Sequence, residues 1–529
     1  MNITTANTNY LKMKKTNLSN KLFIILTFIC LACSNMTYSQ NEEAVIKSLF
    51  DNYEVPQWYK DAKFGIWLHW GPQSIPLEGG GWYARHMYMD STEIKKEPWG
   101  KGAWEYHRRT YGHQSVFGYK DLCNSWKAEK FDADQMVKQF KTWGAKYVAV
   151  IANHHDNFDL FNSSVHPWNS TKMGPKRDIV GEFSRAAIKN NLKWVATVHV
   201  FRAKGWLAPA FGADKSGEKA GVPYDGNLTL ADGKGKWWEG MNPQQFYATN
   251  YPDFEKELTI RHLELVEHYK PDILYFDDSK IPEPIMLACQ KLYLNSYKKN
   301  GSNQAVITVK SPEKGTVRDV EKGVSEGLLP EYWQSETTLA EDWFFKPKAD
   351  GSSQLKHNVR SLKELLVDVI SKRGSLMVNV AVRGDGSIPQ DQFQIMSEFG
   401  LWLKANSEAI YGTEPWKIYG EGGETRGGQF NERGVDSKPW DSSVFRFTRD
   451  KKNKILYVYV FGNPNAKSVL VKSLAEQKLF AAQIIHLSLI GSNQRIQWKL
   501  TPNGLSLEMP NKLPFQDCNI LKIKTTNLD

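Results

Sequence analysis

The chain has 529 residues, of which 41% are hydrophobic, 12% aromatic and 24% charged, and its formal net charge is +10. This length suits two domains, because single hydrophobic cores stop growing at about 250–300 residues, and the composition excludes an intrinsically disordered protein. The positive balance is mild and comes with no basic stripe and no nucleic-acid motif, so nucleic acid is not an expected partner.

The first residues have the pattern of an export signal. Four lysines precede an apolar run at 22–32 that is too short to span a bilayer, and small residues follow at 37–39. We expect residues 1–39 to be a signal peptide, the mature protein to be secreted or periplasmic, and no transmembrane segment to remain. Lipid anchoring through Cys33 is an alternative. Loss of the four leader lysines lowers the net charge from +10 to +6, and three widely spaced cysteines remain, which indicate no disulfide framework and no metal motif.

The first strand of the folded part is predicted to start at Phe64. It ends at the pair His69 and Trp70, which a Gly-Pro turn follows. A histidine and a tryptophan at the end of a strand are well placed to contact a ligand. The next loop, 79–85, opens with three glycines that would permit close approach of the backbone to another group, although simple loop flexibility also explains them.

The next two predicted strands also end in histidines. A helix is expected over 132–143, and the strand at 147–151 then leads to His154 and His155. Adjacent strand residues point in opposite directions, so one of these histidines should face the barrel mouth and the other the flank. A third strand, 194–201, brings His199 near its end. No ligand partner stands at helical spacing, so we predict no metal site.

The fourth strand is the short apolar run 273–276, which ends in Asp277 and Asp278. Such a run is typical of a buried parallel strand, and in α/β barrels the carboxyl ends of the strands carry the chemistry. The alternative is that these acids cap a helix or close a turn. Because adjacent strand residues diverge, we expect Asp277 to face the site and Asp278 to lie outside it.

Further strands are predicted at 305–309 and 375–380, with a helix at 362–370 between them. Two segments on the way carry candidate acids, Glu321 and Glu336. The recurring strand–helix units predict an α/β fold, a (β/α)7–8 TIM-like barrel over residues 40–413. From residue 414 the helices cease and short alternating strands follow, which predicts an all-β sandwich domain over 414–529.

Taken together, these motifs resemble the retaining α-L-fucosidases of glycoside hydrolase family 29. The similarity spans about residues 58–420. Its specific parts are 64–71 and 145–158 with 168–170, and the segment 271–277 resembles the strand that bears the nucleophile. The resemblance implies that Asp277 is the nucleophile. It also implies that His69, His154, His155 and His199 contact the fucose hydroxyls while Trp70 and Tyr83 shape the pocket. One position departs from the family pattern, because Gly81 stands where an acidic residue is common.

The resemblance leaves the general acid/base open between Glu321, which stands about where several members carry it, and Glu336. Retaining cleavage needs the nucleophile and the acid about 5–5.5 Å apart, and it requires no metal and no organic cofactor. The expected substrate is a fucosylated oligosaccharide or polysaccharide, and the sequence does not indicate an oligomeric state. Two other functions stay open: an α-L-galactosidase of the same mechanism, acting on algal galactans with or without sulfate, and a carbohydrate-binding protein with an inactive barrel.

Overall fold

A computed structural model describes residues 41–277, 280–423, 439–462, 468–475 and 484–528. The predicted leader, with Cys33, lies outside the described residues, as does Asp278. Signal cleavage and lipid anchoring therefore stay predictions, which N-terminal sequencing and mass measurement of the exported protein would check. Among the helices that the structure describes, none combines the length and the apolar character needed to cross a bilayer.

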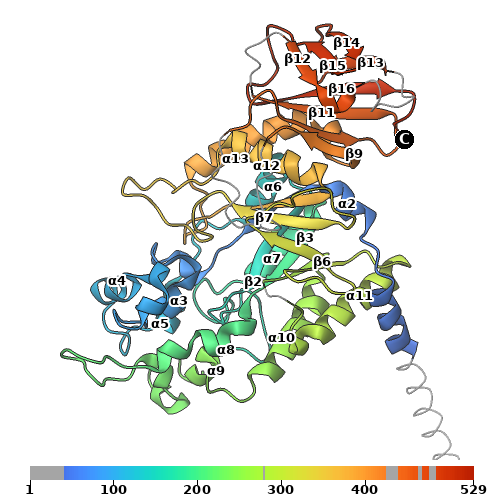
Figure 1. The fold of residues 1–529 in the computed structure, drawn as a ribbon. Coiled ribbons are helices and arrows are strands. Elements are labelled where there is room, and N and C mark those ends of the chain that lie inside the picture. Colours follow the sequence, from blue (N-terminus) through green and yellow to red (C-terminus); the bar gives the residue numbers. More distant parts are fainter. Residues whose placement is uncertain (1–40, 278–279, 424–438, 463–467, 476–483, 529) are drawn as a thin grey trace, which may run out of the picture.

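Eight parallel strands form a closed barrel in chain order (Figure 1). The ring closes because β1 pairs with both β2 and β8, with Gly65 opposite Tyr147 on one side and Met377 on the other. The predicted TIM-like barrel is confirmed, and the number of strands is eight. The strands are β1 (Phe64–Leu68), β2 (Tyr147–Asn153), β3 (Lys193–Val198), β4 (Ile273–Phe276), β5 (Val306–Val309), β6 (Val317–Glu321), β7 (Trp333–Thr338) and β8 (Gly374–Asn379).

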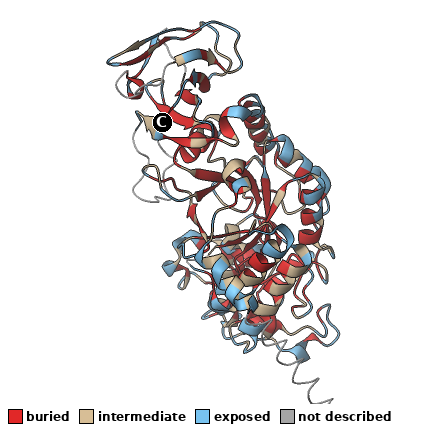
Figure 2. Ribbon diagram, turned by 90° about the vertical axis from the view of Figure 1, so that its right-hand side faces the viewer, coloured by how far each residue is buried: buried red, intermediate tan, exposed pale blue. Residues whose placement is uncertain are grey.

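Helices cover the outside of the barrel between most strands, and their outer faces are exposed while the strands are buried (Figure 2). The connections from β5 to β6 and from β6 to β7 are fully described and contain no helix. Residues 41–51 are helical, and the α-helices that follow are α2 (Gln57–Ala62), α3 (Tyr83–His86), α4 (Ala103–Thr110), α5 (Tyr119–Ser125), α6 (Ala133–Thr142), α7 (Ile179–Lys189), α8 (Ala203–Trp206), α9 (Pro243–Tyr247), α10 (Phe254–Tyr269), α11 (Met286–Asn300), α12 (Val359–Ser371), α13 (Gln390–Ala405) and α14 (Ser407–Ile410).

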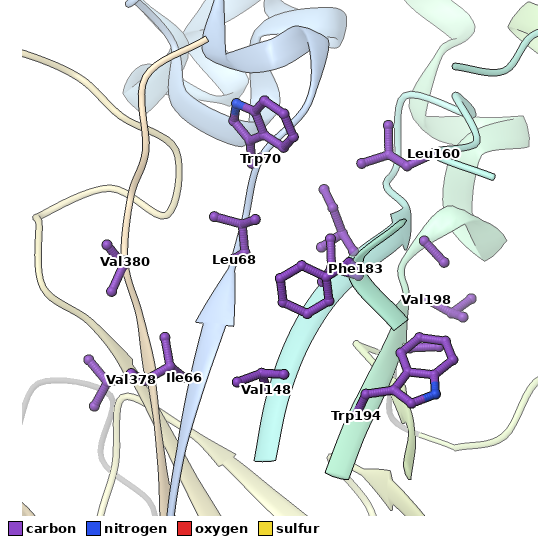
Figure 3. Close-up of a cluster of buried hydrophobic side chains, with 14 of the residues drawn as sticks. Ile66, Leu68, Trp70, Val148, Leu160, Phe183, Trp194, Val198, Val378 and Val380 are labelled. Atoms are coloured by element: carbon purple, nitrogen blue, oxygen red, sulfur yellow. The ribbon is translucent and has the colours of Figure 1, made fainter. Parts of the chain in front are cut away.

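The side chains of β1 alternate between two hydrophobic cores of the barrel, one between strands and helices and one inside the ring of strands. Ile66, Leu68 and, just past the strand end, Trp70 point outward and join the cluster between strands and helices (Figure 3). Trp67 points inward and belongs to the interior cluster with Tyr147. Gly65 also faces inward, and an added Cβ there would lie 2.2 Å from the Tyr147 ring. The absence of a side chain at Gly65 therefore lets Tyr147 fill the barrel interior.

Beyond the barrel, the chain forms two antiparallel sheets that enclose a second hydrophobic core. The predicted β-sandwich is thus confirmed. The five-stranded sheet consists of β9 (Glu414–Glu421), β10 (Phe445–Arg449), β11 (Ile455–Phe461), β16 (Cys518–Thr525) and β13 (Ile484–Leu489). The three-stranded sheet consists of β12 (Ser468–Val471), β15 (Gly504–Glu508) and β14 (Gln497–Thr501).

The five-stranded sheet joins the sandwich to the barrel. Along β11, Leu456 and Val458 enter the sandwich core, whereas Tyr457 and Tyr459 join the barrel's outer core. This alternation follows from the opposite directions of successive strand side chains. Trp402 of α13 donates its indole N–H to the carbonyl oxygen of Cys518 at 3.0 Å. The sandwich therefore packs against the helices that follow the last barrel strands (Figure 1).

Candidate active site

A cavity of about 820 Å³ opens where the carboxyl ends of the barrel strands meet. Seven of the eight strands contribute a polar side chain to it at or just beyond their ends, which is where α/β barrels carry their chemistry. The contributing residues are His69 after β1, His154 and His155 after β2, His199 after β3, Asp277 after β4, Lys310 after β5, Glu321 on β6 and Glu336 on β7. The structure thus brings together all but two of the predicted site residues.

Asp277 lies beside positive and imidazole groups. Its Oδ2 is 3.1 Å from His199 Nδ1 and 3.8 Å from His155 Nε2, and its Oδ1 is 3.5 Å from the Lys310 ammonium. Burial by itself would raise the pKa of Asp277, but Lys310 and His199 outweigh it and hold the pKa well below its usual range. Asp277 is therefore a carboxylate under physiological conditions.

Lys310 is the site residue that the sequence interpretation missed. Its ammonium is 2.9 Å from Asp319 Oδ2 and 3.5 Å from Glu321 Oε2, and it also contacts Glu336 Oε1. Burial would lower the pKa of Lys310, but the surrounding carboxylates raise it well above the ordinary value. One available signal was its position directly after the apolar run 306–309, the same end-of-strand position that singled out Asp277.

Glu321 and Glu336 are partners in the β6–β7 pairing but differ in access. The Glu321 side chain is 32% exposed and accepts a hydrogen bond from Trp343 Nε1 at 3.2 Å. The Glu336 side chain is 1% exposed, and Tyr275 donates its hydroxyl to Oε1 at 3.0 Å. Burial and the neighbouring Asp319 raise the pKa of Glu336 well above its usual value, although Lys310 opposes them.

The three predicted catalytic acids are close together. Asp277, Glu321 and Glu336 each place one oxygen within 4.8 Å of the others. Such a group could in principle bind a metal ion, but the Lys310 ammonium lies within 3.5 Å of each of the three carboxylates. Lys310 therefore supplies positive charge at this place, and it competes with any metal cation for these oxygens.

His69, His154 and His155 line the wall next to Asp277 as neutral imidazoles. His154 and His155 both face the cavity, which corrects the prediction that one of them points to the flank. Burial lowers the pKa of His69 and His154 well below the usual value and that of His155 to about 4. Gln73 Nε2 donates to His154 Nδ1 at 2.9 Å, so His154 carries its proton on Nε2. His155 donates from Nδ1 to the carbonyl oxygen of His199, which leaves Nε2 as an acceptor. The wall thus offers both donors and acceptors to sugar hydroxyls.

Trp70 and Tyr83 do not line the cavity, which corrects the prediction that they shape the pocket. Trp70 is buried on the outward side of the barrel wall (Figure 3), and its indole donates to the carbonyl oxygen of Arg383 at 2.8 Å. Tyr83 is buried against α4, with its hydroxyl 2.8 Å from His107 Nδ1. In each case the preceding residue, His69 or Trp82, reaches the cavity instead.

Other aromatic residues form the apolar wall. Trp343 packs against His69 with ring centroids 4.8 Å apart, and Phe344 packs edge-on against His154 at 5.2 Å. An added Cβ on Gly81 would lie 2.9 Å from the Phe344 ring. The position where the resemblance leads us to expect an acidic side chain is therefore closed by Phe344, and this stretch of wall is apolar.

Comparisons with protein families, with individual relatives and with solved structures all lead to α-L-fucosidases. The family model described as Alpha-L-fucosidase matches residues 29–408, and the one described as Alpha-L-fucosidase C-terminal domain matches residues 441–524. Plasma alpha-L-fucosidase of Homo sapiens is 26% identical over 484 residues, which is 87% of each chain. Tissue alpha-L-fucosidase of Rattus norvegicus is 26% identical over 389 residues, 71% of this chain and 74% of the relative. The crystal structure of the Thermotoga maritima alpha-fucosidase with fucose matches with a TM-score of 0.65 at 24% identity, covering 89% of this chain and 97% of that one.

Proposed function

The chain belongs to the α-L-fucosidase family of glycoside hydrolases, and from this premise we propose that it releases terminal α-L-fucose from glycans by a retaining, double-displacement mechanism. The observation that carries the proposal is the short separation between an ionised Asp277 and the accessible Glu321, with carboxylate oxygens within 4.8 Å. Retaining glycosidases hold their two carboxyl groups about 5–5.5 Å apart, whereas inverting enzymes need about 6.5–9.5 Å to admit a water molecule.

In the first step, Asp277 attacks the anomeric carbon of fucose while Glu321 donates its proton to the departing oxygen. The carbon–oxygen bond to the leaving group breaks as the bond to the Asp277 carboxylate forms. Ion pairing with Lys310 and the nearby His199 keep Asp277 deprotonated and ready to attack. In the second step, Glu321 accepts a proton from water, the water oxygen bonds to the anomeric carbon, and Asp277 is released.

We assign the acid/base role to Glu321 because it can reach a leaving group. Both side chains line the cavity, but that of Glu321 is 32% exposed, whereas that of Glu336 is 1% exposed and shares its Oε1 between Tyr275 and Lys310. The raised pKa of Glu336 by itself would favour the opposite choice. However, Tyr275 and Lys310 hold the Glu336 carboxyl in the buried interior, and an acid held there is poorly placed for proton transfer, which needs hydrogen-bond contact.

The wall of the cavity suits both the polar hydroxyl groups and the apolar methyl group of fucose. The neutral imidazoles of His69, His154 and His155 provide donors and acceptors for the ring hydroxyls. Fucose carries a methyl group at C6, and the rings of Phe344 and Trp343 supply an apolar surface in the same cavity. The two other functions considered from the sequence, α-L-galactosidase and inactive binding protein, are not favoured, because both matched family models are fucosidases and the acids of the mechanism are assembled.

We also infer that the enzyme works outside the cytoplasm, in secreted, periplasmic or lipid-anchored form. This inference rests on the leader pattern of residues 1–39 alone. The expected partner is a fucosylated oligosaccharide or polysaccharide, in keeping with the family.

The nucleophile assignment is tested with Asp277→Ala. We expect kcat on an aryl α-L-fucoside to fall on the order of 10⁴-fold or more, because the residue acts in both steps. Azide should restore part of the cleavage and yield the β-fucosyl azide. Asp134→Ala is the control, because Asp134 is an exposed residue of α6 that pairs with Lys189. Retention is tested separately by NMR on the unaltered enzyme. Early appearance of β-L-fucose, or a fully active Asp277→Ala variant, would overturn the proposal.

A further inference from the structure

We propose that the exposed indoles of Trp99 and Trp82 form a binding platform for the sugar that precedes fucose, on the leaving-group side of the scissile bond. The inference rests on the proposed function and adds to it a subsite that takes a pyranose ring. Both tryptophans line the same cavity as Asp277 and Glu321. Trp99 is 63% exposed and Trp82 is 37% exposed, so each leaves a large apolar surface in contact with water.

The arrangement of rings leads from the reacting carboxylate to the mouth of the cavity. His155, which faces Asp277, lies 6.4 Å from the Trp82 ring, and the Trp82 ring lies 5.9 Å from that of Trp99. Exposure increases along the same path, from the buried His155 to the mostly exposed Trp99. A fucose held by the buried histidines would therefore leave Trp99 uncovered. The part of the substrate that continues outward from the anomeric oxygen is the part that can reach Trp99.

The chemistry of an indole suits a sugar ring. The C–H faces of a pyranose are apolar and stack on aromatic planes, while its hydroxyls stay hydrated or bind polar groups. Lys322, Asp342 and Lys346 line the same cavity and offer such polar groups. The two indoles meet at an interplanar angle of 88°, so they present two differently oriented faces.

The platform is also held rigid. Trp82 stacks on His86 with ring centroids 5.7 Å apart, and His86 Nε2 lies 2.9 Å from Glu97 Oε2. Glu97 also accepts from Arg85 Nη2 at 2.7 Å. Next to Trp99, an added Cβ on Gly100 would lie 2.2 Å from the His86 ring, so the backbone approaches this imidazole closely. A surface fixed in this way loses little conformational entropy when a sugar binds.

The test compares substrates that differ only in the leaving group. α-L-Fucosyl fluoride carries a single atom there and cannot reach the platform, whereas fucosylated trisaccharides with α-1,2, α-1,3 or α-1,4 linkages can. For Trp99→Ala we expect kcat/KM on the best trisaccharide to fall about tenfold, which corresponds to about 1.4 kcal/mol. We expect kcat/KM on the fluoride to stay within about twofold, since interactions with the missing sugar cannot be lost.

Trp498→Ala is the matched control, because Trp498 is 40% exposed on β14 of the sandwich and does not line the cavity. It should leave both substrates unaffected. Unchanged trisaccharide hydrolysis in Trp99→Ala would overturn the platform, and so would equal losses on both substrates, which would indicate damage to the loop. Failure of the unaltered protein to hydrolyse the fluoride would instead overturn the proposed function, so the two failures are distinguishable.

Discussion

At the scale of single residues, Lys310 supplies the positive charge that offsets the carboxylates of the site. Four carboxylates, those of Asp277, Asp319, Glu321 and Glu336, lie within 3.5 Å of its ammonium. Four negative charges so close together would repel one another strongly, and the usual outcome is that some of them hold protons. The structure fits this outcome, because the pKa of Asp277 is lowered while that of Glu336 is raised.

This arrangement predicts the effect of Lys310→Met on the pH profile. Burial would raise the pKa of Asp277, and Lys310 is the largest of the groups that lower it. Without Lys310, Asp277 should take up its proton at higher pH. The acid limb of kcat/KM should therefore move upward by about 1–3 pH units, the usual effect of a nearby opposite charge. The measurement is kcat/KM against pH, which reports on groups of the free enzyme.

Lys310→Arg is the control for this experiment because it keeps the positive charge, and its acid limb should stay close to that of the unaltered enzyme. Circular dichroism separates a folded variant from an unfolded one. A folded Lys310→Met variant with an unshifted acid limb would contradict the role assigned to the ammonium.

A second prediction at this scale separates the two glutamates. With an activated aryl fucoside, Glu321→Gln should still form the glycosyl-enzyme but hydrolyse it slowly, because protonation of the leaving group is no longer needed while activation of water is. With a substrate that has a poor leaving group, the loss should be about 10²–10⁴-fold. Burst kinetics and azide rescue provide the readouts. If Glu336→Gln gives this pattern and Glu321→Gln does not, the assignment is reversed.

At the scale of elements, a buried ion pair joins α12 of the barrel to β10 of the sandwich. Arg446 Nε lies 2.6 Å from Asp368 Oδ1, and Lys372 Nζ lies 2.8 Å from the other oxygen. The Arg446 guanidinium also lies over the Trp440 ring, 4.3 Å from its centroid. Burial would raise the pKa of Asp368, but Arg446 and Lys372 hold it below the usual value.

We therefore expect Arg446→Met to lower the free energy of unfolding by about 3–5 kcal/mol at neutral pH, since it leaves a buried carboxylate with one partner fewer. Because the folded pKa of Asp368 is depressed, this stabilisation is present above about pH 4, the usual range of an aspartate, and is lost as the pH falls through the folded pKa. Urea unfolding at pH 7 and at pH 3 measures both values.

Arg449→Met is the control on the same strand. Arg449 pairs with Glu414 at 2.8 Å in a partly exposed position, where ion pairs contribute about 0–1 kcal/mol. Equal losses for the two variants would contradict a special role of the buried pair.

At the scale of the whole molecule, the sandwich and the active site lie on different sides of the barrel. None of the described residues beyond 346 lines the cavity. The sandwich packs on α12 and α13, while the loop helices α3, α4, α5, α8 and α9 gather at the lower left in Figure 1, away from it. The cavity receives Gly79, Gly80, Gly81, Trp82 and Trp99 from the connection after β1, and Asp342, Trp343, Phe344 and Lys346 from the one after β7, whereas the sandwich packs on the barrel away from the cavity.

Local patterns in the sequence were sufficient for the fold class and for much of the candidate site. Strand and helix periods, which depend on a few neighbouring residues, predicted the barrel and the sandwich. Barrel strands carry chemistry at their carboxyl ends, and this rule alone predicts that His69, His154, His199 and Asp277 share one cavity. The same rule applies to Lys310, but a single lysine after a strand does not indicate which residues it pairs with.

The tertiary structure decided how these residues face one another. Closure of eight strands fixes which side chains meet across the barrel, and no local pattern encodes that register. Only the closed barrel places Lys310 among four carboxylates, distinguishes the accessible Glu321 from the buried Glu336, and turns Trp70 and Tyr83 away from the cavity. The same holds for Trp99, whose exposed ring meets those of Trp82 and His86 from an earlier turn of the same connection.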